Sequence, residues 1–242
     1  MGFPTNTSRI PNGMTNASEG QTLSAAGVPD PAWAHVDFDD LDAYHASDWT
    51  ITKVGTGTVA NVAGNGGLVA LTNTTGATDA IYVQRPTANY AFGTPGRDTF
   101  FKISGKVSDV TNTVIYAGLI SQSATPLTAN DGVWIVKATA QTGLVLKSVV
   151  GGVTKSVAFP STDVLVNNTF FELGFHVSAS GDVRGFFNPT TGAPTTTPSG
   201  QRCVLTAPGL TTANLAVSYG ILNSNAAANV FTVDYYAAVQ HR

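Results

Sequence analysis

The sequence carries little charge. Asp, Glu, Lys and Arg make up 11% of its 242 residues, which is less than half the share usual in globular proteins. The net charge is −3, and Lys and Arg occur singly, without a basic run. This distribution argues against a nucleic-acid partner. Thr, Asn and Ser cost less to desolvate than Lys or Glu, so such a surface suits extensive contact with other protein.

Cysteine and long apolar runs are also scarce. Cys203 is the single cysteine, so no internal disulfide can form, which fits assembly in a reducing cytoplasm. No apolar stretch approaches the roughly 20 residues of a membrane span. The opening MGFPTNTSRIPNG lacks the basic and apolar regions of a secretory signal. We therefore expect neither a membrane partner nor a secreted protein.

Catalytic and metal-binding motifs are missing. Of the two glutamates, Glu19 and Glu172, neither has an acidic neighbour at the spacing that sandwich glucanases use. The four histidines show no zinc-binding spacing, and His176 is interpreted as a sheet histidine with satisfied hydrogen bonds. There is no G-x-S-x-G elbow and no phosphate loop. We expect a protein that is not an enzyme, with no catalytic residue, no metal and no cofactor.

The stretch VDFDDLDAYHASDWTIT, residues 36–52, holds four aspartates within six positions. Aligned as a Ca²⁺ loop from Asp37, it places Leu41 at the fifth position and Asp42 where glycine is required. We interpret the cluster as structural, and a single Ca²⁺ site or a catalytic role remain as alternatives.

In this structural interpretation, HVDFD is an edge strand whose core-facing side buries Val36 and Phe38. Asp39 or Asp40 then caps the following turn by accepting hydrogen bonds from free backbone N–H groups. Leu41 and Tyr44 cover the edge of the core.

From residue 35 onward, short runs rich in β-branched and aromatic residues alternate with turn residues, and no amphipathic helix of three turns occurs. Such a pattern predicts an all-β fold, a single antiparallel β-sandwich over residues 34–242. The expected strands are HVDFD, WTITKVG, GLVALT, AIYVQR, TFFKISGKV, VIYAGLIS, GVWIVKAT, LVLKSVV, VTKSVAF, FFELGFHVS, DVRGFFNP, RCVLTA, LAVSYGIL and VFTVDYYAAVQ.

Local patterns give more specific predictions. Gly151-Gly152 and Ser180-Gly181-Asp182 are expected to turn two hairpins. Strict alternation groups Leu144, Leu146 and Ser148 on one face. In the last strand it groups Phe231, Val233 and Tyr235 on one face and Thr232, Asp234 and Tyr236 on the other.

Trp134 shares a face with Gly132 and Val136 and is expected to pack in the core. The isolated aspartates are expected to cap turns and loops: Asp79, Asp98, Asp109, Asp131, Asp163, Asp182 and Asp234.

Residues 1–33 are rich in Asn, Thr, Ser, Gly and Pro, with few large apolar side chains. We interpret them as an extended N-terminal arm that another subunit holds in place. Phe3, Ile10 and Trp33 are the candidate partner contacts, and Trp33 stands where the arm meets the sandwich.

Four segments together resemble virion structural proteins of tailed bacteriophages: FDDLDAYHASDWTIT, DGVWIVKATAQTGLVLKSVVGG, FFELGFHVSASGDVRGFFN and VFTVDYYAAVQHR. The resemblance covers about residues 35–242 and implies a concanavalin A-like jelly roll. It further implies a capsid decoration (cement) protein on the virion surface, assembled in the host cytoplasm, with the major capsid protein as partner. A head fibre or tail component is the alternative role within that family. Three-fold positions on shells favour a homotrimer.

Two other classes of function remain open. A carbohydrate-binding adhesin would expose two or more aromatic side chains beside polar ones, although no lectin-type Ca²⁺/Mn²⁺ ligand set is evident in this sequence. A sandwich hydrolase would need two carboxylates that converge in a cleft.

Overall fold

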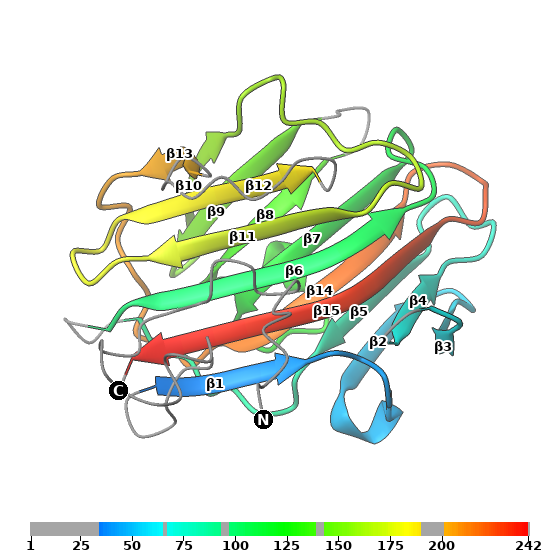
Figure 1. The fold of residues 1–242 in the computed structure, drawn as a ribbon, viewed down its shortest axis with the longest axis horizontal. Coiled ribbons are helices and arrows are strands. Elements are labelled where there is room, and N and C mark those ends of the chain that lie inside the picture. Colours follow the sequence, from blue (N-terminus) through cyan, green and yellow to red (C-terminus); the bar gives the residue numbers. More distant parts are fainter. Residues whose placement is uncertain (1–33, 65–66, 93–96, 139–142, 190–200, 242) are drawn as a thin grey trace, which may run out of the picture.

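The computed structural model describes residues 34–64, 67–92, 97–138, 143–189 and 201–241. Fifteen strands form two antiparallel sheets that pack face to face (Figure 1). The described residues contain no helix long and apolar enough to cross a membrane. The expected all-β sandwich is therefore confirmed, whereas the arm, residues 1–33, lies outside the described residues.

The larger sheet, sheet A, has eight strands: β1 (Ala34–Asp39), β3 (Thr58–Val62), β4 (Leu68–Thr72), β6 (Thr99–Val107), β11 (Phe171–Val177), β12 (Val183–Pro189), β13 (Gln201–Leu205) and β15 (Val230–His241). Their order in space is β13-β12-β11-β6-β15-β4-β3, and β1 pairs with the second half of β15.

Sheet B has seven strands: β2 (Thr50–Val54), β5 (Ala80–Gln84), β7 (Thr113–Ile120), β8 (Gly132–Lys137), β9 (Leu144–Val150), β10 (Val153–Ala158) and β14 (Ala216–Asn223). Their order in space is β10-β9-β8-β7-β14-β5-β2. Two single turns of 3-10 helix, Ala46–Asp48 and Pro126–Thr128, lie in the connections.

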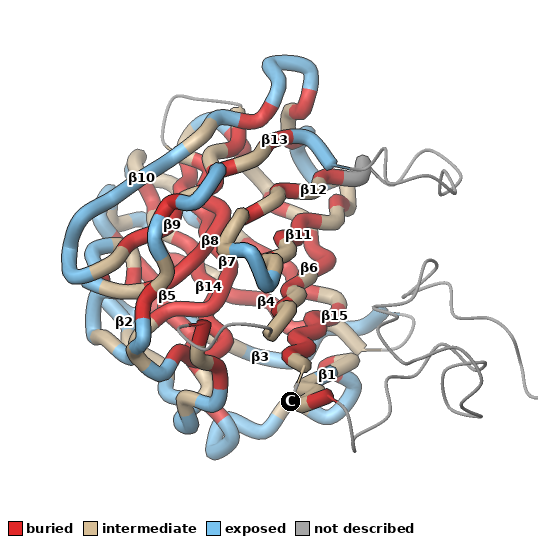
Figure 2. The backbone as a smooth tube through the Cα atoms, turned by 90° about the vertical axis from the view of Figure 1, so that its left-hand side faces the viewer, coloured by how far each residue is buried: buried red, intermediate tan, exposed pale blue. Residues whose placement is uncertain are grey.

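The core fills the space between the two sheets, where Figure 2 shows the buried segments side by side. Strands of both sheets contribute the side chains that point inward, such as Phe101 and Ile103 from β6 and Tyr219 from β14. Fully burying one such side chain contributes about 1.5–3 kcal/mol. Leu144, Leu146 and Ser148 are all buried, as the alternation predicted.

The two predicted hairpin turns are present. Gly151 and Gly152 both have positive φ, 55° and 81°, and join β9 to β10. A positive φ suits glycine because it has no Cβ. Gly181, with φ 89°, turns β11 into β12.

The alternation predicted for the last strand is wrong after Val233. A β-bulge shifts the register of β15 against β6, so that Tyr235 lies opposite Ser104 and Tyr236 lies opposite Ile103. Tyr236 therefore joins the core with Val233, and Tyr235 points away from it. The extra residue of a bulge reverses which side chains of the following segment face inward.

Candidate functional site

The aspartate cluster of β1 binds Arg85, which follows β5. The Arg85 Nη2 atom lies 2.9 Å from Asp39 Oδ2 and 3.5 Å from Asp37 Oδ1. Its guanidinium carbon is 4.2 Å from the centroid of the Trp49 ring. Arg85 Nε donates to the hydroxyl of Tyr236 at 2.7 Å, and that hydroxyl donates to Asp37 at 2.8 Å. The cluster thus ties the edge of sheet A to sheet B.

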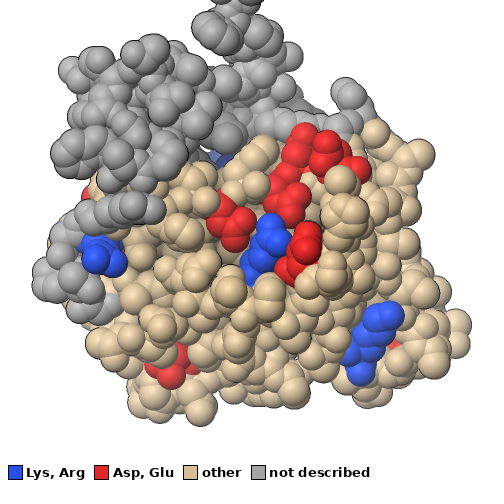
Figure 3. All heavy atoms as spheres, turned by 90° about the horizontal axis from the view of Figure 1, so that it is seen from below, with Lys and Arg blue, Asp and Glu red and all other residues tan. Residues whose placement is uncertain are grey.

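The face that contains this edge is seen in Figure 3, where a few acidic and basic groups gather in a mostly uncharged surface. Within the described part of the chain, no three His, Cys, Asp or Glu residues are arranged to hold a metal ion. Because Asp37 and Asp39 have a cation as partner, the structural interpretation accounts for them.

The predicted details of this segment are partly right. Asp39 Oδ1 accepts a hydrogen bond from the backbone N–H of Leu41 at 2.8 Å, which is the predicted turn cap. Leu41 is fully buried, and Tyr44 packs against the core. Phe38, however, is 42% exposed, and Val36 packs in the separate cluster of Ala34, Ala237 and Val239, so the prediction that both face the core is wrong. Because β1 pairs with β15 beyond the bulge, Phe38 lies opposite Ala237 on the outer face of sheet A.

The outer face of sheet B holds a second apolar cluster that contains Tyr82, Tyr116 and Trp134. Trp134 is 2% exposed, which confirms that it packs in an apolar interior, although not between the sheets. The segment 121–131 contributes Leu127 and Ala129 to this cluster. None of the seven strands of sheet B contains Asp or Glu. Their side chains therefore cannot supply the carboxyl pair of a glycosidase.

The outer face of sheet A is different, because charged and aromatic side chains meet there. Lys102 on β6 forms an ion pair with Glu172 on β11, with Nζ 3.0 Å from Oε2. The hydroxyl of Tyr235 donates to the other oxygen, Oε1, at 2.6 Å. Lys102 Nζ also lies 5.6 Å from the centroid of the Tyr235 ring. Ser104 donates to Asp234 Oδ2 at 3.4 Å.

We call these five residues, Lys102, Ser104, Glu172, Asp234 and Tyr235, the charge cluster. Asp234 and Glu172 lie on the two strands that flank β6 at Ser104, roughly 9–10 Å apart across the sheet. That spacing is near the upper limit of an inverting glycosidase pair. Both oxygens of Glu172 are engaged, however, by Lys102 and Tyr235. The arrangement therefore fixes the Glu172 side chain between Lys102 and Tyr235.

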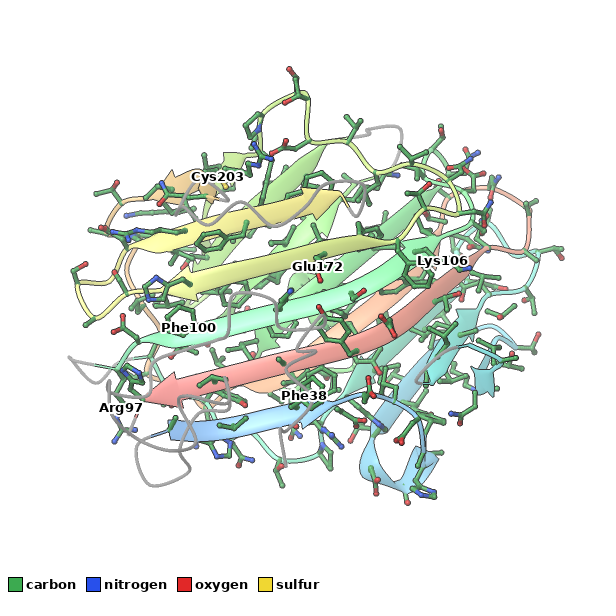
Figure 4. The ribbon with its side chains drawn as sticks, in the orientation of Figure 1. Phe38, Arg97, Phe100, Lys106, Glu172 and Cys203 are labelled. Carbon is green, nitrogen blue, oxygen red and sulfur yellow. The ribbon has the colours of Figure 1, made fainter. Side chains whose placement is uncertain are left out.

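An apolar row lies beside the charge cluster on the same face. We call it the outer strip: Ala34, Val36 and Phe38 from β1, Ala237 and Val239 from β15, and Phe100 from β6. Figure 4 shows Phe38, Phe100 and Glu172 around this face of sheet A. Phe38 contacts Tyr235, with ring centroids 6.2 Å apart, so the outer strip and the charge cluster form one surface.

His176 borders this surface and, as predicted for a sheet histidine, lies on β11 with a hydrogen-bond partner for its Nε2. Its ring stacks on Phe100 at a centroid distance of 4.2 Å and an interplanar angle of 3°. Its Nε2 lies 2.9 Å from Asp98 Oδ1, which also accepts the N–H of Ala179 at 3.0 Å. Burial lowers the pKa of His176, and the hydrogen bond to Asp98 opposes that shift.

The candidate contacts Phe3, Ile10 and Trp33 lie outside the described residues. The charge cluster was not predicted, since its members are far apart in the sequence and meet only through strand register. The sequence does indicate that Lys102 and Glu172 point outward. Each stands between two apolar residues, in FKI (residues 101–103) and FEL (residues 171–173). That pattern predicts that they point outward, but not that they meet.

Comparison with known proteins identifies the fold. No protein-family model matches this sequence, and no curated protein sequence matches it. A protein of unknown function from Shewanella oneidensis MR-1 has a similar structure, with TM-score 0.58, 10% identity, and coverage of 100% of this chain and 95% of that one. An endo-1,3-beta-glucanase from Streptomyces sioyaensis gives TM-score 0.59, 10% identity, and coverage of 88% and 98%.

Peanut lectin gives TM-score 0.53, 10% identity, and coverage of 86% of this chain and 97% of the lectin. The fold is the concanavalin A-like jelly roll of lectins and glucanases. At this level of identity the likeness is to the fold, and function has to be argued from the site itself.

Proposed function

We propose that this chain is a non-catalytic virion protein that decorates a capsid. In this proposal it binds the major capsid protein through the outer face of sheet A and residues 1–33, as a homotrimer. The observation that carries the proposal is the paired state of Glu172 beside the apolar outer strip. A surface with an apolar centre and charges that are already paired can be buried against protein without stranding an ion.

Two features of the sequence support the same function. The chain resembles virion proteins of tailed bacteriophages over about residues 35–242. Its charged fraction of 11% leaves a surface that is inexpensive to bury over a large area.

Co-sedimentation with assembled heads that lack the protein tests this proposal. We expect the wild-type chain to sediment with heads and to saturate them. Phe38→Asp, which places a charge in the outer strip, should lose binding at least tenfold. Val153→Asp is the matched control, because Val153 is 68% exposed on β10, away from the strip. No sedimentation of wild type, or full occupancy by Phe38→Asp, would contradict the proposal.

A carbohydrate-binding adhesin is the second candidate. It is supported by the fold shared with peanut lectin and a glucanase. On this chain, the half-exposed ring of Phe38 beside Tyr235, Lys102 and Glu172 offers an apolar platform next to both a donor and an acceptor. A glycan array would then show saturable binding that Phe38→Ala weakens and Val153→Ala does not. An array without signal would remove this candidate.

A further inference from the structure

The strand β3 is an open edge of sheet A. All five of its residues, Thr58–Val62, pair with β4, and no other strand of the described chain pairs with it. Figure 1 shows it at the end of the sheet far from β13. Four of its five residues are exposed, and Val62 is 41% exposed. The backbone N–H and C=O groups on its free side are therefore available to another strand.

The composition of β3 differs from that of the other edges. Among the described strands, β1, β2, β10 and β13 also have one side without a partner strand. Each of these four carries charge: Asp37 and Asp39 on β1, Lys53 on β2, Lys155 on β10 and Arg202 on β13. Charged side chains, proline and bulges are the usual devices that prevent pairing between sheet edges. The sequence of β3, TVANV, has no charge and no proline, and its register against β4 is unbroken, so it lacks all three.

We propose that β3 pairs antiparallel with β3 of a second copy of this chain, so that the two copies of sheet A become one continuous sheet across a two-fold axis. The strand suits a partner identical to itself. An axis at Ala60 pairs all five residues and brings no charges together. The same pairing at any of the other four edges would bring like charges into one short strand pair, which is destabilising.

The side chains of β3 fit this pairing. Val59 lies opposite the core residue Leu71 of β4, so alternation places Thr58, Ala60 and Val62 on the outer face of sheet A. With the axis at Ala60, Val62 of one copy lies opposite Thr58 of the other. Both are β-branched, which is a favourable combination across two strands. The pairing therefore covers the exposed Val62 side chain of each copy.

Sedimentation velocity tests the pairing in solution. As its concentration rises, the wild-type chain should form a species with twice the mass of Ala60→Lys, in which two like charges meet at the axis. Ala60→Lys should weaken the association at least tenfold and keep the wild-type urea unfolding curve, because Ala60 is exposed. Ser156→Lys, which adds the same charge to the exposed edge strand β10, is the matched control and should associate as wild type does. No doubling by wild type, or equal association of Ala60→Lys, would overturn the proposal.

Mixing two charge variants tests whether the axis lies at Ala60. Ala60→Glu alone should associate as weakly as Ala60→Lys. An equal mixture of the two should regain the association, because the introduced glutamate of one copy faces the introduced lysine of the other. A mixture as weak as either variant alone would contradict the pairing.

Disulfide crosslinking tests the register. In a Cys203→Ser background, Ala60→Cys should form a crosslinked dimer on oxidation with diamide, because directly opposed Cα atoms of antiparallel strands are about 4.5–5.5 Å apart. Thr58→Cys should crosslink at least tenfold more slowly, since Val62 and not Thr58 of the second copy lies opposite it. Equal rates for the two variants would overturn the proposed pairing.

The same measurements separate this contact from the homotrimer of the proposed function, and none of them uses capsids. A two-fold pair doubles whatever assembly the chain otherwise forms. If Ala60→Lys sediments as three chains and wild type as six, both contacts exist. If Ala60→Lys sediments as one chain and wild type as two, the β3 pair stands and the homotrimer is wrong.

Discussion

Several of the few charged side chains in this protein hold parts of the fold together. Arg85 joins β1 to sheet B through Asp37, Asp39 and the Trp49 ring. Lys137 is fully buried at the end of β8, where its Nζ donates to the backbone carbonyl of Thr113 at 2.6 Å and to that of Val110. A low charge content therefore does not mean that the charges are unimportant.

Replacing Arg85 with lysine tests whether the guanidinium group, and not only its charge, holds the edge of sheet A. A lysine cannot lie flat on Trp49 while it also binds Asp39 and the Tyr236 hydroxyl. We expect Arg85→Lys to lower the free energy of unfolding by about 1–2 kcal/mol in urea titrations. Lys155→Arg on the exposed strand β10 should stay within about 0.5 kcal/mol of wild type. Equal effects of the two changes would contradict this role.

The burial of Lys137 predicts a specific pH dependence of stability. Desolvation lowers its pKa from 10.5 to about 8, and Asp109 partly offsets this. Between pH 8 and 10.5 the folded chain has lost this proton while the unfolded chain keeps it. The unfolded state then binds more protons, so the free energy of unfolding rises with pH, by at most about 3 kcal/mol.

Urea titrations at pH 7.5, 8.5 and 9.5 would measure this rise as the difference between wild type and Lys137→Met. Cys203, whose pKa burial raises to about 11, is present in both chains and cancels. Lys155→Met, which removes an exposed lysine, should keep the wild-type slope. Parallel pH profiles for wild type and Lys137→Met would show that this proton is not linked to folding.

At the scale of strands, composition and turn residues were sufficient to predict most elements. All fourteen predicted strands are present within one or two residues at most ends. The missed strand is β3, Thr58–Val62, whose side chains are mostly exposed and show no apolar alternation. Edge strands of this kind are specified by backbone pairing with a neighbour, here β4, and leave little trace in the sequence.

The bulge in β15 explains why the sequence predicted the wrong tyrosine for the core. Asp234 is an extra residue between the pairs Val233–Gly105 and Tyr235–Ser104. The single insertion sends Tyr236 inward to Asp37 and Arg85, and Tyr235 outward to Glu172. Nothing in VFTVDYYAAVQ distinguishes a bulge from strict alternation, because both tyrosines suit either face.

Alanine substitution of the two tyrosines tests this assignment. Tyr236→Ala should cost about 3–5 kcal/mol, because it opens a cavity against Trp49 and Tyr219 and leaves Arg85 without one partner. Tyr235→Ala should cost less than Tyr236→Ala, because Tyr235, although only 2% exposed, packs on the outer face of sheet A and not between the sheets. Urea unfolding of both variants gives the comparison. The reverse order would mean that the strand follows simple alternation.

At the scale of the whole molecule, the two sheets have different outer surfaces. Sheet B buries its outer aromatic side chains under segment 121–131, whereas sheet A presents the outer strip and the charge cluster. The sequence predicted the sandwich but not this surface, because Lys102, Glu172 and Tyr235 meet only after three strands take their register. Local spacing, on which motif searches depend, carries no information about such contacts.

The division between core and outer surface predicts how the molecule responds to truncation. The described core between the sheets draws its side chains from residues 41–238, so removing residues 1–33 should leave it intact. We expect the chain of residues 34–242 to unfold in one cooperative transition with an m-value within about 10–15% of wild type. Its free energy of unfolding should fall by at most about 3 kcal/mol, because the side chains packed between the sheets stay in place. A chain that ends at residue 229 and lacks β15, which pairs with β1, β4 and β6, should not fold. A broad transition or a much smaller m-value for 34–242 would instead mean that residues 1–33 are part of the folding unit itself.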